Sequence, residues 1–176
     1  WGFPEFDDQR LFGMLILEGA QAGLSWATIL KKRKGYHRAF HDFEIKKVAA
    51  MTLEDELALL HDPSIVRNKL KIKAAVKNAK GALKIIEEQG SLSKYLWSFV
   101  GGRPKVNRWE SFREIPVKTT EAEEMSKALK KRGFSFVGPT ILYAFMQACG
   151  MVLDHPVGTP QHEKVLRYLK RRKLLE

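Results

Sequence analysis

The chain is organised around one stretch near its N-terminus, Met14-Leu15-Ile16-Leu17-Glu18-Gly19-Ala20-Gln21-Ala22-Gly23-Leu24-Ser25-Trp26. Its apolar residues recur at helical spacing, which predicts a helix from about Gln9 to Ala22, capped by Asp7 or Asp8. Gly23 and Leu24 form the tip of the turn that follows. Ser25 is a suitable cap for a second helix that begins with Trp26, carries Ile29 and Leu30 inward, and ends at Gly35.

Glu18 falls on the apolar face of the first predicted helix, one turn after Met14 and Leu15. A carboxylate in an apolar setting is costly unless it is paired, and burial raises its pKa because desolvation disfavours the charged form. Two interpretations stay open at this point. Glu18 either braces a neighbouring helix, with Trp26 as an ordinary core residue, or is a functional acid in a cleft with Trp26 nearby.

The composition favours a nucleic-acid partner. The 176 residues include 31 Lys and Arg against 20 Asp and Glu, a formal net charge of +11. A folded chain this basic usually binds a polyanion. The single cysteine, Cys149, excludes an internal disulfide and is typical of a reducing compartment such as the cytoplasm. No apolar run approaches the roughly 20 residues that span a membrane.

Nearly every other segment has a helical pattern and none has a convincing strand pattern, so we predict an all-α fold. Residues 1–176 are expected to form one domain, whose helices can divide into two lobes with a pocket between them. The longest regular pattern begins at Ser64 and ends at Gly90, with lysines around an apolar stripe. A solvated face is the default interpretation of these lysines, and contact with nucleic acid is the alternative.

Residues 126–150 predict two helices joined by the short turn Gly133-Phe134-Ser135-Phe136-Val137-Gly138, with Lys130 and Lys131 on the approach. Pro139 suits a first helical position. The N–H groups of the turn and of the following helix can point at a DNA phosphate without reading sequence, while Phe134, Phe136 and Val137 anchor the turn in the core. An ordinary helical hairpin with a glycine cap is the alternative.

Taken together, these motifs identify a family. Leu17 to Trp26, followed by Ile29-Leu30-Lys31-Lys32-Arg33, resembles the signature of the DNA-3-methyladenine glycosylase I family, a divergent branch of the helix-hairpin-helix DNA glycosylases. The resemblance runs from Trp1 to about His155. It also includes the following segments: Trp97-Ser98-Phe99-Val100, Ser126 to Gly138, Phe145-Met146-Gln147-Ala148-Cys149-Gly150 and Asp154-His155.

The resemblance implies roles for individual residues. Glu18 corresponds to the acid that contacts the excised base, Trp26 to the aromatic wall on which the base stacks, and Gly23 with Leu24 to the wedge that fills the gap left by an extruded nucleotide. The residues that it implies in the grip on DNA phosphates are Lys130, Lys131, Gly133, Phe136, Val137, Gly138 and Thr140. Other helix-hairpin-helix glycosylases use an aspartate downstream of the hairpin. Asp154 is the candidate here, although bracing of its turn is the favoured role.

The implied activity is base-excision repair: hydrolysis of the N-glycosidic bond of 3-methyladenine in alkylated double-stranded DNA by a monomer at the bacterial nucleoid. One alternative is a catalytically silent helix-hairpin-helix DNA-binding protein. Another is an all-α RNA-binding or scaffolding domain, which charge alone would support. Release of damaged bases, and preference for methylated duplex DNA over RNA, distinguish these possibilities.

The family's zinc site differs in this sequence. The resemblance implies a cysteine and a histidine before Trp1, followed by a histidine and a cysteine near the C-terminus. His155 matches the third ligand, but Thr159 stands where the second cysteine would be, and His162 is only a conceivable substitute. Because tetrahedral zinc needs four ligands, we expect no metal and no other cofactor in this chain.

Overall fold

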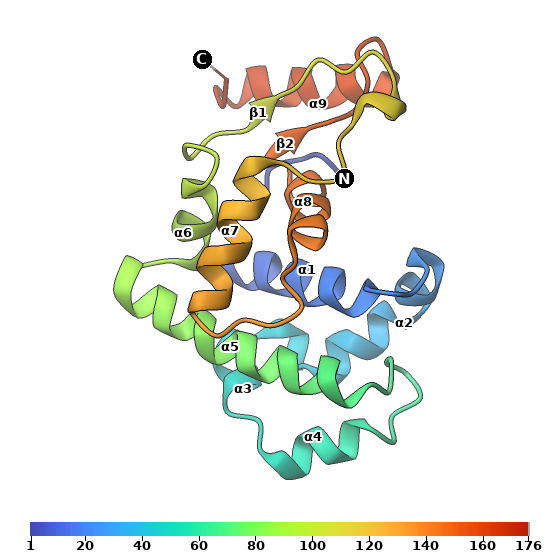
Figure 1. Ribbon diagram of the computed structural model, residues 1–176, viewed down its shortest axis with the longest axis vertical. Coiled ribbons are helices and arrows are strands. Elements are labelled where there is room, and N and C mark those ends of the chain that lie inside the picture. The colour runs from blue at the N-terminus through green and yellow to red at the C-terminus, as the bar shows by residue number, and fades with distance from the viewer. Residues whose placement is uncertain (176) are drawn as a thin grey trace.

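The computed structural model describes residues 1–175 and is almost entirely helical, which confirms the predicted all-α class. Figure 1 shows the arrangement of its elements. The longer helices are α1 (Asp8–Gln21), α2 (Trp26–Ala39), α5 (Lys69–Gln89), α7 (Thr120–Lys131), α8 (Pro139–Ala148) and α9 (Pro160–Arg171). The shorter elements are η1 (His41–Phe43), α3 (Ile45–Ala49), α4 (Leu53–Leu59), α6 (Leu92–Ser98), β1 (Lys105–Val106), η2 (Phe112–Glu114) and β2 (Val152–Leu153).

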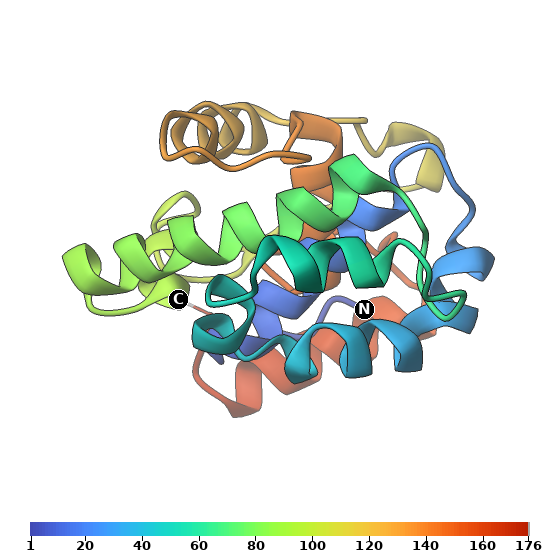
Figure 2. The ribbon, with the colours of Figure 1, turned by 90° about the horizontal axis from the view of Figure 1, so that it is seen from below.

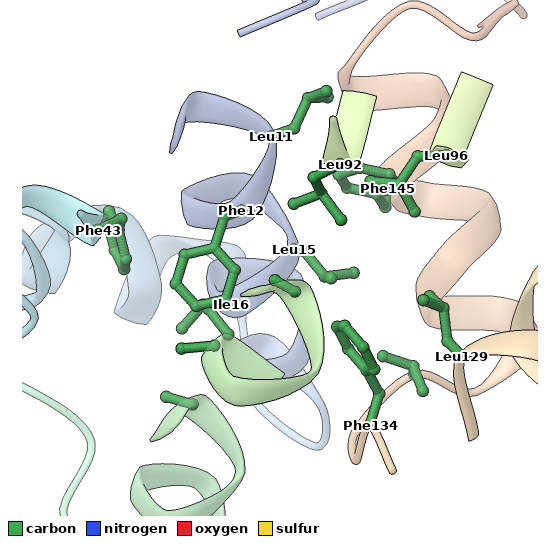
Figure 3. Packing of buried hydrophobic residues seen from close by; sticks show 14 of the residues in the cluster. Leu11, Phe12, Leu15, Ile16, Phe43, Leu92, Leu96, Leu129, Phe134 and Phe145 are labelled. Atoms are coloured by element: carbon green, nitrogen blue, oxygen red, sulfur yellow. The ribbon is translucent and has the colours of Figure 1, made fainter. Parts of the chain in front are cut away.

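Helix α1 lies at the centre of the molecule and contacts α2, α5, α6 and α8 (Figure 1). It begins where the sequence predicts, because the Asp7 side chain accepts a hydrogen bond of 2.9 Å from the backbone N–H of Arg10. Figure 3 shows the core on both sides of this helix. Phe12 points toward the side that holds Phe43, and Leu92 and Phe145 lie on the other side. Helix α1 has two acids, Asp8 in its first turn and Glu18 further along. The central position of the helix explains why Glu18 is buried.

Two predicted helix boundaries are wrong. Gly35 does not end the second helix, because α2 continues to Ala39. A Cβ at Gly35 would collide with the carbonyl oxygen of Ser64, so this glycine permits close packing within a helix rather than termination. Helix α5 begins at Lys69 instead of Ser64, since the Asn68 side chain accepts the N–H groups of Leu70 and Lys71 as its cap.

A short pair of strands is present that the sequence pattern does not predict. Strands β1 and β2 run parallel, with Lys105 opposite Val152 and Val106 opposite Leu153. Two residues per strand are too few to produce a recognisable alternation, so the prediction of no strand fails locally while the fold class holds. The pair joins the segment after α6 to the segment after α8.

No helix in the part of the chain that the structure describes is both long and apolar enough to cross a membrane. The expected division into two lobes stays a prediction.

Candidate active site

A pocket of about 620 Å³ opens between α1, α2 and α8, a size typical of small-molecule sites. Its walls combine aromatic and aliphatic side chains with a few polar groups. The lining residues are Trp1, Met14, Leu17, Glu18, Trp26, Ile29, Leu30, Arg33, Ala144, Gln147 and Ala148. The two residues expected to contact a base, Glu18 and Trp26, therefore share one pocket.

Glu18 is the acid of this pocket and is only 4% exposed. Within residues 1–175 the Glu18 carboxylate makes no ion pair and no hydrogen bond. Every fully buried side-chain oxygen among these residues has a hydrogen-bond partner. The oxygens of Glu18 are therefore not fully buried, and they reach the open space of the pocket. Burial raises the pKa of Glu18 to about 7, because desolvation disfavours its charged form. The absence of a bonding partner among these residues argues against the brace and favours the functional interpretation.

Trp26 is placed by the cap of α2. The Ser25 hydroxyl accepts a hydrogen bond of 3.2 Å from the N–H of Thr28, which sets Trp26 at the first helical position. Its side chain is 40% exposed and lines the pocket, so it is not an ordinary core residue. The helical pattern predicts Leu30 inside with Ile29, but Leu30 is 60% exposed and also lines the pocket.

Gln147 is a polar group of the pocket that the sequence reasoning did not single out. Its amide nitrogen donates a hydrogen bond of 2.9 Å to Asp154, a fully buried carboxylate. Asn107, Trp109 and Tyr143 donate to the same carboxylate. The four donors match the bracing role of Asp154. The side-chain amide oxygen of Gln147 has no hydrogen-bond partner among the described residues and faces the pocket that Gln147 lines. The helical spacing of Ala144, Gln147 and Ala148 on one face was the available signal for Gln147.

The turn between α1 and α2 projects away from the core. Gly23 adopts a left-handed backbone with φ of +75°, and no atom would lie within 4 Å of a Cβ added there. Leu24 is 36% exposed. The turn is closed on itself, because the Gln21 side chain donates to the Leu24 carbonyl at 2.6 Å and the Leu24 N–H donates to the Gln21 carbonyl at 2.7 Å. The predicted wedge residues, Gly23 and Leu24, therefore lie at the exposed tip of a turn that two internal hydrogen bonds hold in place.

The hairpin between α7 and α8 is held from inside. Gly133 begins the turn with a left-handed backbone, φ of +86°. The Ser126 hydroxyl donates a hydrogen bond of 2.7 Å to the backbone carbonyl of Val137. Phe134 and Val137 are buried as expected, but Phe136 is not a core residue. Phe136 is half-buried with φ of +55° and packs on Gly19 of α1. The hairpin therefore rests directly on the helix that carries Glu18.

The outer side of the hairpin is open. Lys130, Lys131 and Thr140 are exposed, and no atom would lie within 4 Å of a Cβ at Gly138. Figure 2 shows the hairpin and the α1–α2 turn toward the same side of the molecule, in the upper part of the view. The structure thus brings the two sets of expected DNA contacts to one side, although they are about 110 residues apart in the sequence.

The residues at the position of the family's zinc site, His155, Thr159 and His162, make contacts that do not fit a zinc site. The imidazole of His155 packs on the Trp1 ring at 3.8 Å, and Thr159 caps α9 through a hydrogen bond from the N–H of His162. His162 itself is bonded to the backbone carbonyl of His155 at 2.9 Å. In the described range 1–175 no three His, Cys, Asp or Glu side chains are grouped to hold a metal ion.

Comparisons with known proteins show the family to which this chain is similar. Residues 1–162 match the family described as methyladenine glycosylase. The chain is 50% identical over 158 residues to DNA-3-methyladenine glycosylase 1 of Escherichia coli (strain K12). The aligned residues cover 90% of this chain and 84% of that protein. It is also 50% identical over 155 residues to the DNA-3-methyladenine glycosylase of Haemophilus influenzae, with 88% and 84% covered.

Solved structures are similar in the same way. A crystal structure of 3-methyladenine DNA glycosylase I superposes with a TM-score of 0.88 at 48% identity and covers 91% of this chain and 88% of its own. The Staphylococcus aureus 3-methyladenine DNA glycosylase I, described for its recognition of 3-methyladenine, has a TM-score of 0.90 at 43% identity, with 92% and 86% covered.

Proposed function

Because the chain belongs to the methyladenine glycosylase family, we propose that the pocket between α1, α2 and α8 receives 3-methyladenine and that Glu18 contacts it. The protein is a base-excision repair glycosylase that hydrolyses the N-glycosidic bond of 3-methyladenine in alkylated DNA. One observation carries the assignment of the site: the buried carboxylate of Glu18, unpaired within residues 1–175, shares a pocket with the exposed ring of Trp26.

The chemistry of the substrate explains why so few groups are needed. Methylation at N3 gives the adenine a positive charge, so the base is already a good leaving group and needs little acid catalysis. The face of Trp26 supports such a base by stacking and by cation–π attraction, which contributes about 1–2 kcal/mol when the cation is desolvated. A neutral adenine lacks this attraction, so the same wall favours the damaged base.

Glu18 complements the charge of that base. With its pKa near 7, the empty pocket holds comparable amounts of the neutral and charged acid at neutral pH. A cation that enters the pocket lowers the pKa of a nearby carboxyl group. Glu18 therefore becomes a carboxylate when the methylated base is bound, and this carboxylate stabilises the cationic form from which the bond breaks.

The DNA is engaged at two places. Extrusion of a nucleotide costs a few kcal/mol, less for a damaged base, and something must fill the gap that it leaves. Gly23 and Leu24 fill that gap as a wedge, supported by the exposure of their turn. The hairpin residues from Lys130 to Thr140 hold the phosphate backbone without reading its sequence.

We also propose that the enzyme acts as a monomer in the bacterial cytoplasm at the nucleoid, and that it needs no metal or other cofactor. Release of 3-methyladenine should therefore be unchanged after dialysis against EDTA. Sedimentation of the free protein should give the mass of a single chain.

The decisive experiment compares base release from methylated duplex DNA by the wild type and by Glu18→Gln under single-turnover conditions. We expect selective release of 3-methyladenine by the wild type and loss of most release in the variant. Glu54→Gln, an exposed glutamate of α4, is the matched control and should behave like the wild type. Unchanged release by Glu18→Gln would remove Glu18 from the mechanism.

A further inference from the structure

Lys71 stands apart from the other lysines of α5. Lys69, Lys73, Lys77, Lys80 and Lys84 are exposed, whereas Lys71 is only half-exposed in the first turn of the helix. Its ammonium donates hydrogen bonds to the backbone carbonyls of Ala20, at 2.8 Å, and Ala22, at 2.6 Å. The expectation of a solvated lysine face thus fails at this one position.

These two carbonyls end α1 immediately before Gly23 and Leu24. The last carbonyls of a helix lack intrahelical partners and carry partial negative charge, so an ammonium suits them. The ammonium is partly withdrawn from water where it reaches these carbonyls, and this desolvation lowers the pKa of Lys71. Two of its three donors are then occupied by the base of the wedge turn.

The same ammonium lies 5.9 Å from the ring centre of Phe136, within cation–π range. Phe136 belongs to the hairpin, and its backbone packs closely on Gly19. A Cβ added at Gly19 would lie 3.2 Å from the carbonyl oxygen of Phe136. Lys71 therefore bonds to the residue immediately before the wedge and lies against the hairpin. Figure 2 shows these two elements on the same side of the molecule. No other lysine of α5 makes comparable bonds to both elements within the described residues.

We propose that Lys71 is a positioning residue for base extrusion, which holds the Gly23–Leu24 wedge in a fixed place relative to the phosphate-gripping hairpin. The inference rests on the proposed function. A wedge can fill the gap in a base stack only if its support does not yield when the stack closes against it. The hydrogen bonds of Gln21 stiffen the turn internally, and Lys71 anchors it to α5.

The test compares methylated duplex DNA with methylated single-stranded DNA, in which no base pair opposes extrusion. Lys71→Met removes the donors at similar length, Lys71→Arg retains donors, and Lys73→Met is the control on an exposed neighbour. We expect Lys71→Met to slow single-turnover release from duplex by about tenfold, because the two charge-assisted hydrogen bonds that anchor the wedge turn are lost. Release from single strands should stay within about twofold, because the wedge is not needed there.

Lys71→Arg should recover part of the duplex rate, and the salt dependence of duplex binding should be unchanged in Lys71→Met. If Lys71→Met folds poorly, Gln21→Ala weakens the same turn and should give the same duplex-selective defect. Equal slowing on both substrates would show a merely structural role, and a salt slope reduced by about one would show a phosphate contact; either result overturns the proposal. Failure of the proposed function is distinguishable, since the wild type would then release no base from either substrate.

Discussion

Asn78 in the middle of α5 holds the backbone of Ser135 in the hairpin through a pair of hydrogen bonds. The Asn78 side-chain amide donates a hydrogen bond of 2.9 Å to the Ser135 carbonyl, and the Ser135 N–H donates one of 2.8 Å to the Asn78 side-chain oxygen. Asn78 is only 3% exposed, so this pair lies out of water. A buried side chain thereby shapes the turn expected to meet DNA phosphates, although it does not reach the DNA-facing surface itself.

Asn78→Ala should therefore weaken DNA binding without removing a charge. Loss of the amide leaves the half-buried N–H and carbonyl of Ser135 unpaired, which lowers the free energy of unfolding by about 1–3 kcal/mol. Urea unfolding measures that loss, and titration of duplex DNA at several salt concentrations measures affinity. The affinity should fall while the salt slope stays the same. Lys80→Ala, on the exposed face of α5, is the control for stability.

Lys130→Ala and Lys131→Ala should have the opposite signature. Both side chains are exposed in the last turn of α7, beside the hairpin. If each neutralises one phosphate, each substitution lowers the slope of log affinity against log salt by about 1 and leaves the thermal stability nearly unchanged. Binding by either variant with the full wild-type slope would mean that the corresponding lysine contacts no phosphate.

Asp154→Asn tests whether Asp154 is a brace or a catalyst. The amide replaces one acceptor oxygen by a donor, so two of the four donors around position 154 lose their partner. We expect a loss of unfolding free energy on the order of 3 kcal/mol. Base release by the folded variant, measured at low temperature, should fall far less than in Glu18→Gln. Full stability together with abolished release would instead place Asp154 in the chemistry.

The sequence predicts well those features that depend on neighbours along the chain. The cap at Asp7, the apolar face that buries Glu18 and the glycine turn at Gly133 are local patterns, and each is present in the structure. The confirmed family resemblance added the expected grouping of Glu18 and Trp26, which helical periodicity alone left ambiguous.

The failures share a physical reason, which is that they depend on contacts between distant segments. Gly35 resembles a helix stop until Ser64 is seen to pack on it, and Lys71 resembles a solvated lysine until the end of α1 is placed beside it. Gln147 matters because Asp154 fixes its amide, a relation that two residue types seven positions apart do not reveal. Tertiary contacts decided each of these positions against its local pattern.

Glu18→Gln should stabilise the protein in a pH-dependent manner. Burial raises the pKa of Glu18 from its ordinary value of 4.5 to about 7, so the folded state binds this proton more tightly than the unfolded chain does. The stability of the wild type therefore falls as pH rises from about 4.5 through about 7, and above that range the charged acid costs about 3 kcal/mol. Glutamine carries no charge at any pH and escapes this cost.

Urea unfolding of both proteins at pH 4 and pH 8 measures the effect. The unfolding free energy of Glu18→Gln relative to the wild type should increase by up to about 3 kcal/mol between the two pH values, whereas Glu54→Gln should show no such change. Any constant cost of burying the amide cancels in this comparison. A difference independent of pH would mean that Glu18 titrates normally, and the pocket would then lack the perturbed acid on which recognition of a cationic base depends. Greater stability joined to lost activity would instead mark Glu18 as a residue kept for chemistry at the expense of the fold.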